Sequence, residues 1–157
     1  IVVSLNINNY IEPSFINYYI ACHPLRVVSQ APKYKGLNTP VIVPINSFSD
    51  KVQEEVSHIP HHNFGIKIED TELEYAETYC KLRSPLAMGY TLSLLGAGKA
   101  SKAYLAGFDG YGDHDPKQKE MNRIFEEFSN KNKTLDILAV TPTTYSIERT
   151  SIYNPRL

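Results

Sequence analysis

Four residues of this 157-residue chain have the types and positions to bind a ligand. Asn6 follows an apolar run, Ser84 precedes a helical pattern, and Asp109 and Tyr111 lie in the segment "LAGFDGYGDHDP". A side-chain amide donates and accepts hydrogen bonds at once, which suits the edge of a base or a sugar. A carboxylate at the end of a strand accepts hydrogen bonds from a ligand hydroxyl, and neighbouring glycines let the backbone approach a ligand closely. We take these four residues as the candidate ligand site and assign no catalytic residue.

Structural roles compete with these assignments. The Asn6 side chain has an alternative use, a bond to nearby backbone in a turn. Asp109 also has two open interpretations, a ligand contact or a bond to backbone N–H groups at the strand end.

The residues after Tyr111 suggest a helix start more than a metal site. Asp113 and Asp115 are two carboxylates without further ligands, which makes a weak cation site. Asp115 directly precedes Pro116, which is the pattern of a helix N-cap followed by proline at the first helical position. We interpret His114 as a solvated loop histidine, and we expect no metal site.

Other suggestive patterns have structural explanations. His23 is expected to be a loop or core histidine. The segment "SHIPHHNF" holds three histidines without the fixed geometry that zinc needs, so it is predicted to be a polar loop. The segment "GAGKAS" lacks the spacing of a phosphate-binding loop and follows a helix, so its glycines are interpreted as a helix C-cap.

Apolar runs and helical patterns alternate along the chain and would position these residues. The expected strands are Ile1–Leu5, Leu25–Ser29, Val41–Ile45, Phe64–Ile68, Lys102–Ala106 and Asp136–Val140. The expected helices are Pro13–Cys22, Ser49–Ser57, Ser84–Gly96 and Pro116–Asn130. This pattern predicts an α/β fold, three-layer and Rossmann-like, with a mainly parallel sheet and helices on both faces. Residues 141–157 are expected to be irregular. Ligands bind beyond the carboxyl ends of such strands, so the candidate residues should converge on one crevice.

Bulk composition limits the function classes. Hydrophobic residues make up 42% and charged residues 21%, and the net charge is −1. These values indicate a single soluble α/β domain over residues 1–157 and give no case for binding nucleic acid or a membrane. Cys22 and Cys80 fit no disulfide or metal spacing and are expected to be reduced, buried thiols in a cytoplasmic protein. Because the chain begins inside a strand with Ile1, we expect it to be the C-terminal part of a longer protein.

The chain resembles the C-terminal domain of bacterial proteins of the 4-hydroxy-2-oxovalerate aldolase-like group. The segments that carry the resemblance are, in order, "IVVSLN", "ACHPLR", "LAGFDGYGDHDPKQKEM" and "TPTTYSIERTSIY". The resemblance implies an upstream aldolase-like TIM barrel as a partner domain, and that barrel would carry the carbon–carbon bond cleavage. It therefore implies a non-catalytic accessory role for these residues.

The chain is also distantly similar to one family of bacterial sialyltransferases. Asn6 and the triplet Gly107-Phe108-Asp109 match that family's pattern, and Ser84 lies where a serine faces the cytidine nucleotide. The similarity implies a nucleotide or nucleotide-sugar ligand. The family's opening glycine-rich loop and its downstream catalytic histidine are absent from this chain, which puts glycosyl transfer in doubt.

Three functional hypotheses follow. The first is an accessory domain that binds a nucleotide or nucleotide-sugar and has no other cofactor. The second is a sialyltransferase-like glycosyltransferase. The third is an assembly domain that forms a homo-oligomer. A pocket at the strand ends favours the first two, and an even loop surface favours the third.

Overall fold

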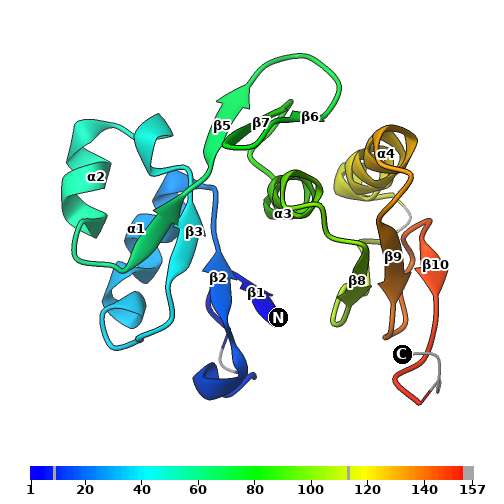
Figure 1. The fold of residues 1–157 in the computed structure, drawn as a ribbon, viewed down its shortest axis with the longest axis horizontal. Helices are drawn as coiled ribbons and strands as arrows, with labels where there is room; N and C mark the ends of the chain where they lie inside the picture. Colours follow the sequence, from blue (N-terminus) through cyan, green and yellow to red (C-terminus); the bar gives the residue numbers. More distant parts are fainter. Residues whose placement is uncertain (9, 113, 154–157) are drawn as a thin grey trace. The chain divides into compact units, whose positions relative to one another are not determined.

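A computed structural model describes residues 1–8, 10–112 and 114–153 of the chain, and Asp113 lies outside the described residues (Figure 1). The chain divides into two compact units, residues 1–94 and residues 95–157. Each unit is an assembly of short strands and helices with its own packing. The two units are described separately below.

The first unit is built on a sheet of four parallel strands in the order β1-β2-β3-β4. These strands are β1 (Val3–Leu5), β2 (Tyr18–Ile20), β3 (Val41–Val43) and β4 (His61–Asn63). The connecting helices are η1 (Pro13–Phe15), α1 (Pro24–Tyr34), η2 (Ile45–Ser47) and α2 (Asp50–Val56). Spatial order follows chain order, so the strand order does not reverse within the described residues of this sheet.

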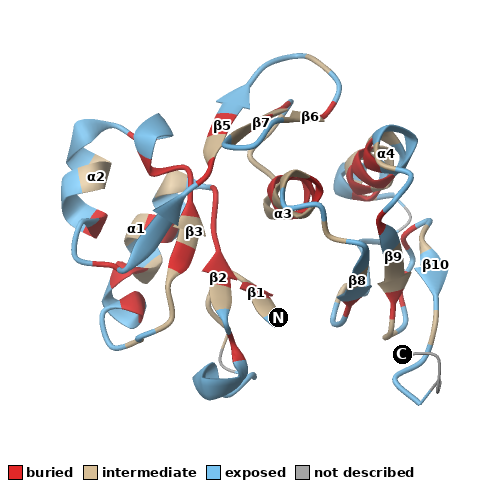
Figure 2. Ribbon diagram, viewed as in Figure 1, coloured by how far each residue is buried: buried red, intermediate tan, exposed pale blue. Residues whose placement is uncertain are grey.

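One face of this sheet is closed by α1 and α2. Tyr19 and Val41 are partners in the register of β2 and β3, and both are buried. Val27 and Tyr34 of α1 and Val56 of α2 belong to the same buried cluster (Figure 2). These buried side chains hold α1 against the sheet near the end of β2. Asn6 lies beside this strand end.

A second, smaller sheet shares a segment with the first. Its order is β5-β7-β6, with β5 (Gly65–Ile68) parallel and β6 (Glu74–Tyr75) antiparallel to β7 (Tyr79–Leu82). Residues 61–68 run through both sheets, because β4 pairs with β3 and β5 pairs with β7. At the junction the Phe64 N–H donates to the Val43 carbonyl, and the Gly65 N–H donates to the Thr78 carbonyl.

The second unit contains a three-stranded parallel sheet in the order β10-β9-β8. Its elements are β8 (Lys102–Leu105), α4 (Pro116–Lys131), β9 (Asp136–Ala139) and β10 (Glu148–Arg149). Helix α3 (Ala87–Ala97) begins in the first unit and ends in the second. The buried side chains of α4 include Met121, Ile124, Phe125 and Phe128.

The end of α3 is closed by a residue with left-handed backbone. The Ala100 N–H donates to the Leu95 carbonyl and the Lys99 N–H donates to the Gly96 carbonyl, which is the Schellman pattern. Lys99 has φ of 54°, so a lysine occupies the position that normally favours glycine. The predicted stop near Gly96 is confirmed, but the left-handed residue is Lys99 and not a glycine.

The predicted α/β class with mainly parallel strands is confirmed. The prediction was wrong between residues 13 and 34. The expected helix Pro13–Cys22 is a short 3₁₀ turn followed by strand β2, and the expected strand Leu25–Ser29 lies inside α1. Tyr19, Ile20 and Ala21 form a fully buried run, and such a run is compatible with either a helix or a central strand.

Four short strands were missed. Three of them, β4, β6 and β10, carry little apolar pattern, whereas β7 alternates buried Cys80 and Leu82 with half-buried residues. All three side chains of β4 are exposed, and its pairing is carried by the backbone alone. Within the described residues no helix is both long and apolar enough to cross a bilayer.

Candidate functional site

Asn6 lies at the carboxyl end of β1 in a constrained turn. Its φ is 60°, in the left-handed region that asparagine tolerates better than most residues. The Asn6 N–H donates to the Ile20 carbonyl at 2.8 Å, and the Asn6 carbonyl accepts from the Ser4 hydroxyl at 2.9 Å. Its side-chain amide forms no hydrogen bond with a residue that the structure describes. The turn is instead stabilised by Asn8, whose side chain bonds to Ser4 and to the N–H of Tyr10.

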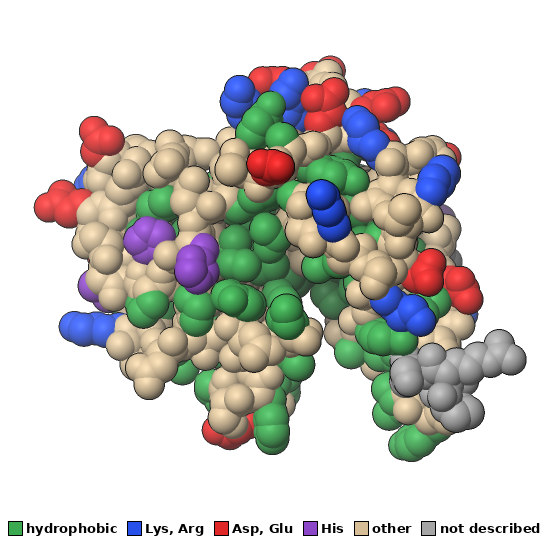
Figure 3. All heavy atoms as spheres, viewed as in Figure 1, with side chains coloured by type: hydrophobic (Ala, Val, Ile, Leu, Met, Phe, Trp, Pro, Cys, Tyr) green, Lys and Arg blue, Asp and Glu red, His purple; other side chains and the backbone are tan. Residues whose placement is uncertain are grey.

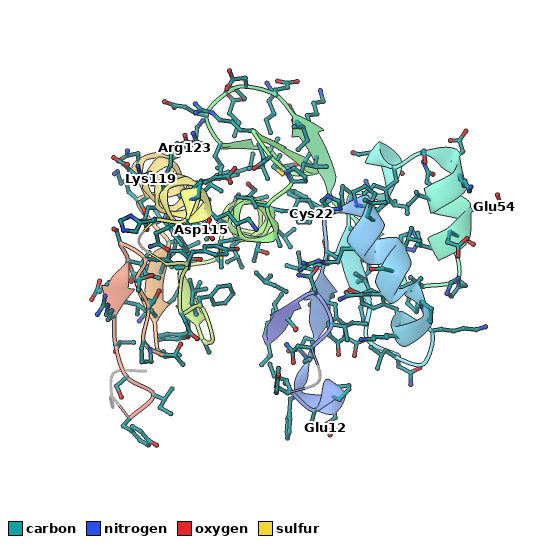
Figure 4. The ribbon with its side chains drawn as sticks, turned by 180° about the vertical axis from the view of Figure 1, so that it is seen from behind. Glu12, Cys22, Glu54, Asp115, Lys119 and Arg123 are labelled. Atoms are coloured by element: carbon teal, nitrogen blue, oxygen red, sulfur yellow. The ribbon has the colours of Figure 1, made fainter. Side chains whose placement is uncertain are left out.

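Ser84 lies near the same strand end. The chain leaves β2 through Ala21 and Cys22, and the Cys22 thiol donates to the Pro85 carbonyl at 3.1 Å (Figure 4). Asn6 is therefore bonded to the last residue of β2, and Pro85, the neighbour of Ser84, is bonded to Cys22 two residues further on. The helix expected from Ser84 begins at Ala87, and the Ser84 carbonyl accepts from the Leu86 N–H in the preceding turn.

The start of α1 completes this edge and was missed by the sequence analysis. His23 is the N-cap residue and Pro24 occupies the first helical turn. The His23 side chain forms no cap hydrogen bond, and the His23 carbonyl accepts from the Arg26 and Val27 N–H groups. The first turn has no acidic residue and carries Arg26 instead. Arg26 is exposed and forms no ion pair within the described part of the chain. The His-Pro pair is a helix-start signal that outweighs the apolar run after it.

Two buried thiols lie beneath this edge. Burial raises the pKa of the Cys22 thiol to about 12, and the nearby Cys80 thiol acts in the same direction. Burial likewise raises the pKa of Cys80 to about 12, against a smaller opposing effect of a hydrogen bond with Ser93. The expectation of free, buried cysteines is confirmed. A thiol with such a high pKa is a poor nucleophile and a poor metal ligand at neutral pH.

In the second unit, Asp109 lies in a loop that is tied to the loop after β9. The Gly107 N–H donates to the Thr141 hydroxyl at 2.9 Å. The Asp109 carbonyl accepts from the Thr144 N–H at 2.8 Å and from the Thr144 hydroxyl at 3.2 Å. The Asp109 side chain is exposed, and its carboxylate forms no hydrogen bond or ion pair with described residues.

Gly110 and Gln118 fix the same loop from two sides. Gly110 has φ of 102°, and a Cβ at this position would lie 1.9 Å from the Thr144 hydroxyl oxygen. The buried Gln118 amide accepts from the Tyr111 N–H at 2.9 Å and donates to the Thr144 carbonyl at 3.0 Å. Gln118 follows Asp115 with capping-box spacing, but its side chain is bonded to the strand-end loops instead.

Tyr111 presents its ring at the surface of this loop. The ring is 38% exposed, and the Lys117 ammonium lies 5.6 Å from its centroid. Asp115 is the N-cap of α4 and accepts from the Lys117 N–H, as predicted. Lys119 and Arg123 extend along α4 from Asp115 (Figure 4). The Arg123 guanidinium lies 3.6 Å from Glu127, so this charge is paired.

The four predicted residues fall into two pairs. Asn6 and Ser84 belong to the first unit, whereas Asp109 and Tyr111 belong to the second. Asn6 follows β1 and Ser84 follows β7, whereas Asp109 and Tyr111 share the loop after β8. The sequence analysis missed Arg26 and Gln118, and only the capping-box spacing of Gln118 carried a local signal.

The histidines do not form a metal centre. Histidine side chains gather on the surface of the first unit (Figure 3). His61 and His62 belong to β4, which corrects the prediction that this segment is a loop. The His61 ring bonds to the Ile59 carbonyl at 2.7 Å, and the His62 ring packs against Tyr18. His114 is exposed, as expected. Among the described residues, no group of three or more His, Cys, Asp or Glu side chains is arranged to hold a metal ion.

The chain matches no family model, and no curated protein or solved structure is significantly similar to it. The resemblances to aldolase-like and sialyltransferase proteins therefore stay predictions. The two strand-end sites themselves carry the functional argument.

Proposed function

We propose that the chain is a non-catalytic accessory domain that binds a nucleotide or nucleotide-sugar, with the ligand's phosphate at the start of α1. The observation that carries the proposal lies at the carboxyl end of β2. Asn6 is bonded there to Ile20, Cys22 is bonded to Pro85 next to Ser84, and α1 begins without a side-chain cap. A strand followed directly by a helix N-terminus is a common arrangement for holding phosphate.

The charges at this edge favour an anion. Free N–H groups at a helix N-terminus carry partial positive charge, and acidic side chains normally offset it. Here α1 has no acid in its first turn, whereas α2 has Asp50 and α4 is capped by Asp115. Arg26 adds a full positive charge at the same end. A bound phosphate would neutralise both charges and form charge-assisted hydrogen bonds.

Asn6 gives the site a means of selecting the base or sugar. Its backbone is fixed by bonds to Ile20 and Ser4, so the side-chain amide is held at the strand end. The amide has both a donor and an acceptor available. Ser84 lies next to Pro85, whose carbonyl accepts from the Cys22 thiol, in the turn that precedes α3.

The accessory role follows from the aldolase-like resemblance and is part of the proposal. In this view an upstream aldolase-like barrel carries the chemistry, and the domain described here binds a ligand beside it in the cytoplasm. The two buried free thiols support a reducing compartment.

A thermal-shift titration tests the proposal. The probes are inorganic pyrophosphate and the cytidine, uridine, guanosine and adenosine nucleotides with their sugar conjugates. A ligand that binds only the native state at a hundredfold excess over Kd raises stability by about 2.7 kcal/mol. We expect a base-selective shift that Arg26→Gln abolishes and Asn6→Ala makes less selective.

The matched control is Lys33→Gln, which removes the same charge from the last turn of the same helix. This variant should keep the full shift. The proposal is wrong if no nucleotide shifts a cooperatively melting protein, or if Lys33→Gln and Arg26→Gln weaken the shift equally. A donor-hydrolysis assay then separates binding from glycosyl transfer, because only a transferase releases the free nucleotide from its sugar conjugate.

A second candidate function is assembly into a homo-oligomer. Tyr10 is 98% exposed and Phe15 is 70% exposed, and Ile11 between them is also exposed. Apolar side chains gathered on one short segment often mark a protein contact. Light scattering with size-exclusion chromatography tests this function: a dimer that dissociates in Tyr10→Ser/Phe15→Ser supports it, and a monomer at all concentrations contradicts it.

A further inference from the structure

We propose that the strand-end loop of the second unit is a separate site for a neutral, hydroxyl-rich ligand such as a sugar ring, bound by Asp109 and Tyr111. The inference rests on the proposed function, since it supplies a sugar site for the same ligand class. It differs from that function in its chemistry, because this loop offers an acceptor and an aromatic face and the edge of the first unit offers donors.

Asp109 is held by its backbone and leaves its side chain free. Both hydrogen bonds from Thr144 end on the Asp109 carbonyl. The carboxylate itself is exposed and bonds to no described residue. A carboxylate in a fixed position accepts hydrogen bonds from two neighbouring hydroxyls of a sugar, one on each oxygen, and such charge-assisted bonds are the strong kind.

Tyr111 is placed two residues away with its own backbone fixed. Its N–H is bonded to Gln118, and its ring remains 38% exposed. An exposed aromatic ring combines an apolar face with a polar hydroxyl, which suits a sugar that has an apolar ring face and a polar rim. The Lys117 ammonium lies over the ring, 5.6 Å from its centroid, so the sugar would pack on the opposite face.

The loop is poorly suited to phosphate. The N–H groups of Gly107, Tyr111 and Thr144 already donate to groups of the protein. The exposed Asp109 carboxylate would repel a phosphate, and the Asp115 carboxylate lies at the start of the next helix. A neutral ligand that donates hydrogen bonds avoids this repulsion.

The loop is also rigid before any ligand arrives. Gly110 is in contact with Thr144, so closely that a Cβ would not fit. Gln118 joins the loop after β8 to the loop after β9 through one buried amide. A site that is fixed in advance loses less conformational entropy on binding, which makes a small contact area more effective.

The experiment is a titration of the full chain, followed by amide chemical shifts. The probes are free galactose, free ribose and inorganic phosphate. We expect the sugars to shift the amides of residues 107–111 and phosphate to leave them unchanged. Asp109→Asn should weaken sugar binding by about tenfold, because the hydrogen bonds lose their ionic partner. Tyr111→Leu should also weaken it.

The matched control is Asp136→Asn, which removes an exposed carboxylate at the amino end of β9 in the same unit. This variant should bind the sugars like the original protein. The inference is overturned if neither sugar shifts residues 107–111, if Asp109→Asn binds them unchanged, or if phosphate binds there instead. Nucleotide binding is read separately through Arg26→Gln, so either proposal can fail while the other stands.

Discussion

The two strand-end edges of this protein have the same architecture and opposite chemistry. In the first unit a parallel strand leads to α1, whose N-terminus is uncapped and has Arg26 in its first turn. In the second unit β8 leads through a longer loop to α4, whose N-terminus is capped by Asp115. The first edge offers hydrogen-bond donors and positive charge. The second offers the Asp109 carboxylate and the Tyr111 ring.

This difference shows that a strand-end location does not decide the ligand. Two features determine whether hydrogen-bond donors or acceptors face the solvent. One is the residue at the N-cap of the next helix, and the other is the set of hydrogen bonds that fix the loop. At the first edge the N-cap side chain of α1 forms no cap hydrogen bond, although the Arg26 and Val27 N–H groups donate to the His23 carbonyl. At the second edge Asp115, Thr141 and Gln118 occupy backbone N–H groups and leave the acidic side chain of Asp109 exposed.

The largest effect expected of a substitution comes from Gly110→Ala, which damages only the second edge. The new Cβ would overlap the Thr144 hydroxyl, and φ of 102° is strained for alanine. We expect a loss of about 3 kcal/mol from the second unit, from backbone strain and overpacking together. Urea unfolding, combined with hydrogen exchange of the β8 and β9 amides, measures this loss of stability.

Gly107→Ala is the control for this substitution. It has a similarly positive φ of 75° but open space around the new Cβ, so only about 1 kcal/mol should be lost. Equal losses for the two variants would show that the Gly110–Thr144 contact does not fix the loop.

The second prediction separates the units by their response to alkaline pH. The folded-state pKa values of Cys22 and Cys80 are raised from 9.0 to about 12, and both thiols lie in the first unit. Because the folded state holds these protons more tightly, the stabilisation is fully present below pH 9 and is lost as pH rises towards 12. The loss is about 1 kcal/mol per thiol for each pH unit between 9 and 12, the interval set by the two pKa values.

Urea unfolding at several pH values measures this dependence, with the second unit as internal reference. There Tyr145 has a raised pKa, chiefly from burial, so a smaller loss should begin above pH 10. At pH 8 both cysteines should resist a disulfide reagent until the protein unfolds. Rapid labelling of the folded protein at that pH would contradict the buried, protonated state of the thiols.

The third prediction concerns a substitution that should stabilise the second unit alone. Lys99→Gly should stabilise it by about 1 kcal/mol, because Lys99 has φ of 54° at the end of α3 and glycine adopts this conformation without steric cost. Lys99→Ala keeps a Cβ and should bring no such gain. Thermal melting of both variants measures the difference, and equal stability would mean that the left-handed backbone at Lys99 carries little strain.

The smallest effect tests the charge at the first edge without ligand. Arg26→Gln removes a positive charge from the positive end of α1, so it should stabilise the free protein by about 0.5 kcal/mol. Lys33→Gln, in the last turn of the same helix, should destabilise it by a similar amount. Melting at low ionic strength measures both, and the same sign for both variants would remove the electrostatic basis of the comparison.

Sequence patterns predicted those elements in which the capping residues and the apolar residues indicate the same boundaries. Helix α4 begins at Pro116, directly after the Asp115 N-cap, as expected, and β3 lies within the expected strand Val41–Ile45. The same reasoning failed for α1, because Pro32 lies inside the helix and Val27 and Val28 resemble a strand. Burial of Val27 against the sheet outweighs these local preferences.

The candidate site was predictable in its residues but not in its grouping. Asn6 and Asp109 were found because strand ends attract polar side chains with a free hydrogen-bonding group. Their separation into two units depends on packing between distant segments, which local patterns do not contain. The hydrogen bonds of Thr144 and Gln118 join residues about 30 positions apart in the chain, so no short sequence motif predicts them.

The strand order of the first sheet has a consequence for how the protein is made. Because β1, β2, β3 and β4 lie in the order in which a ribosome produces them, each new strand can pair with the edge completed just before it. Residues 61–68 then continue from β4 into β5, and β5 can pair with β7 once β6 and β7 have been synthesised. The sheet can thus grow during translation without waiting for a strand from the far end of the chain.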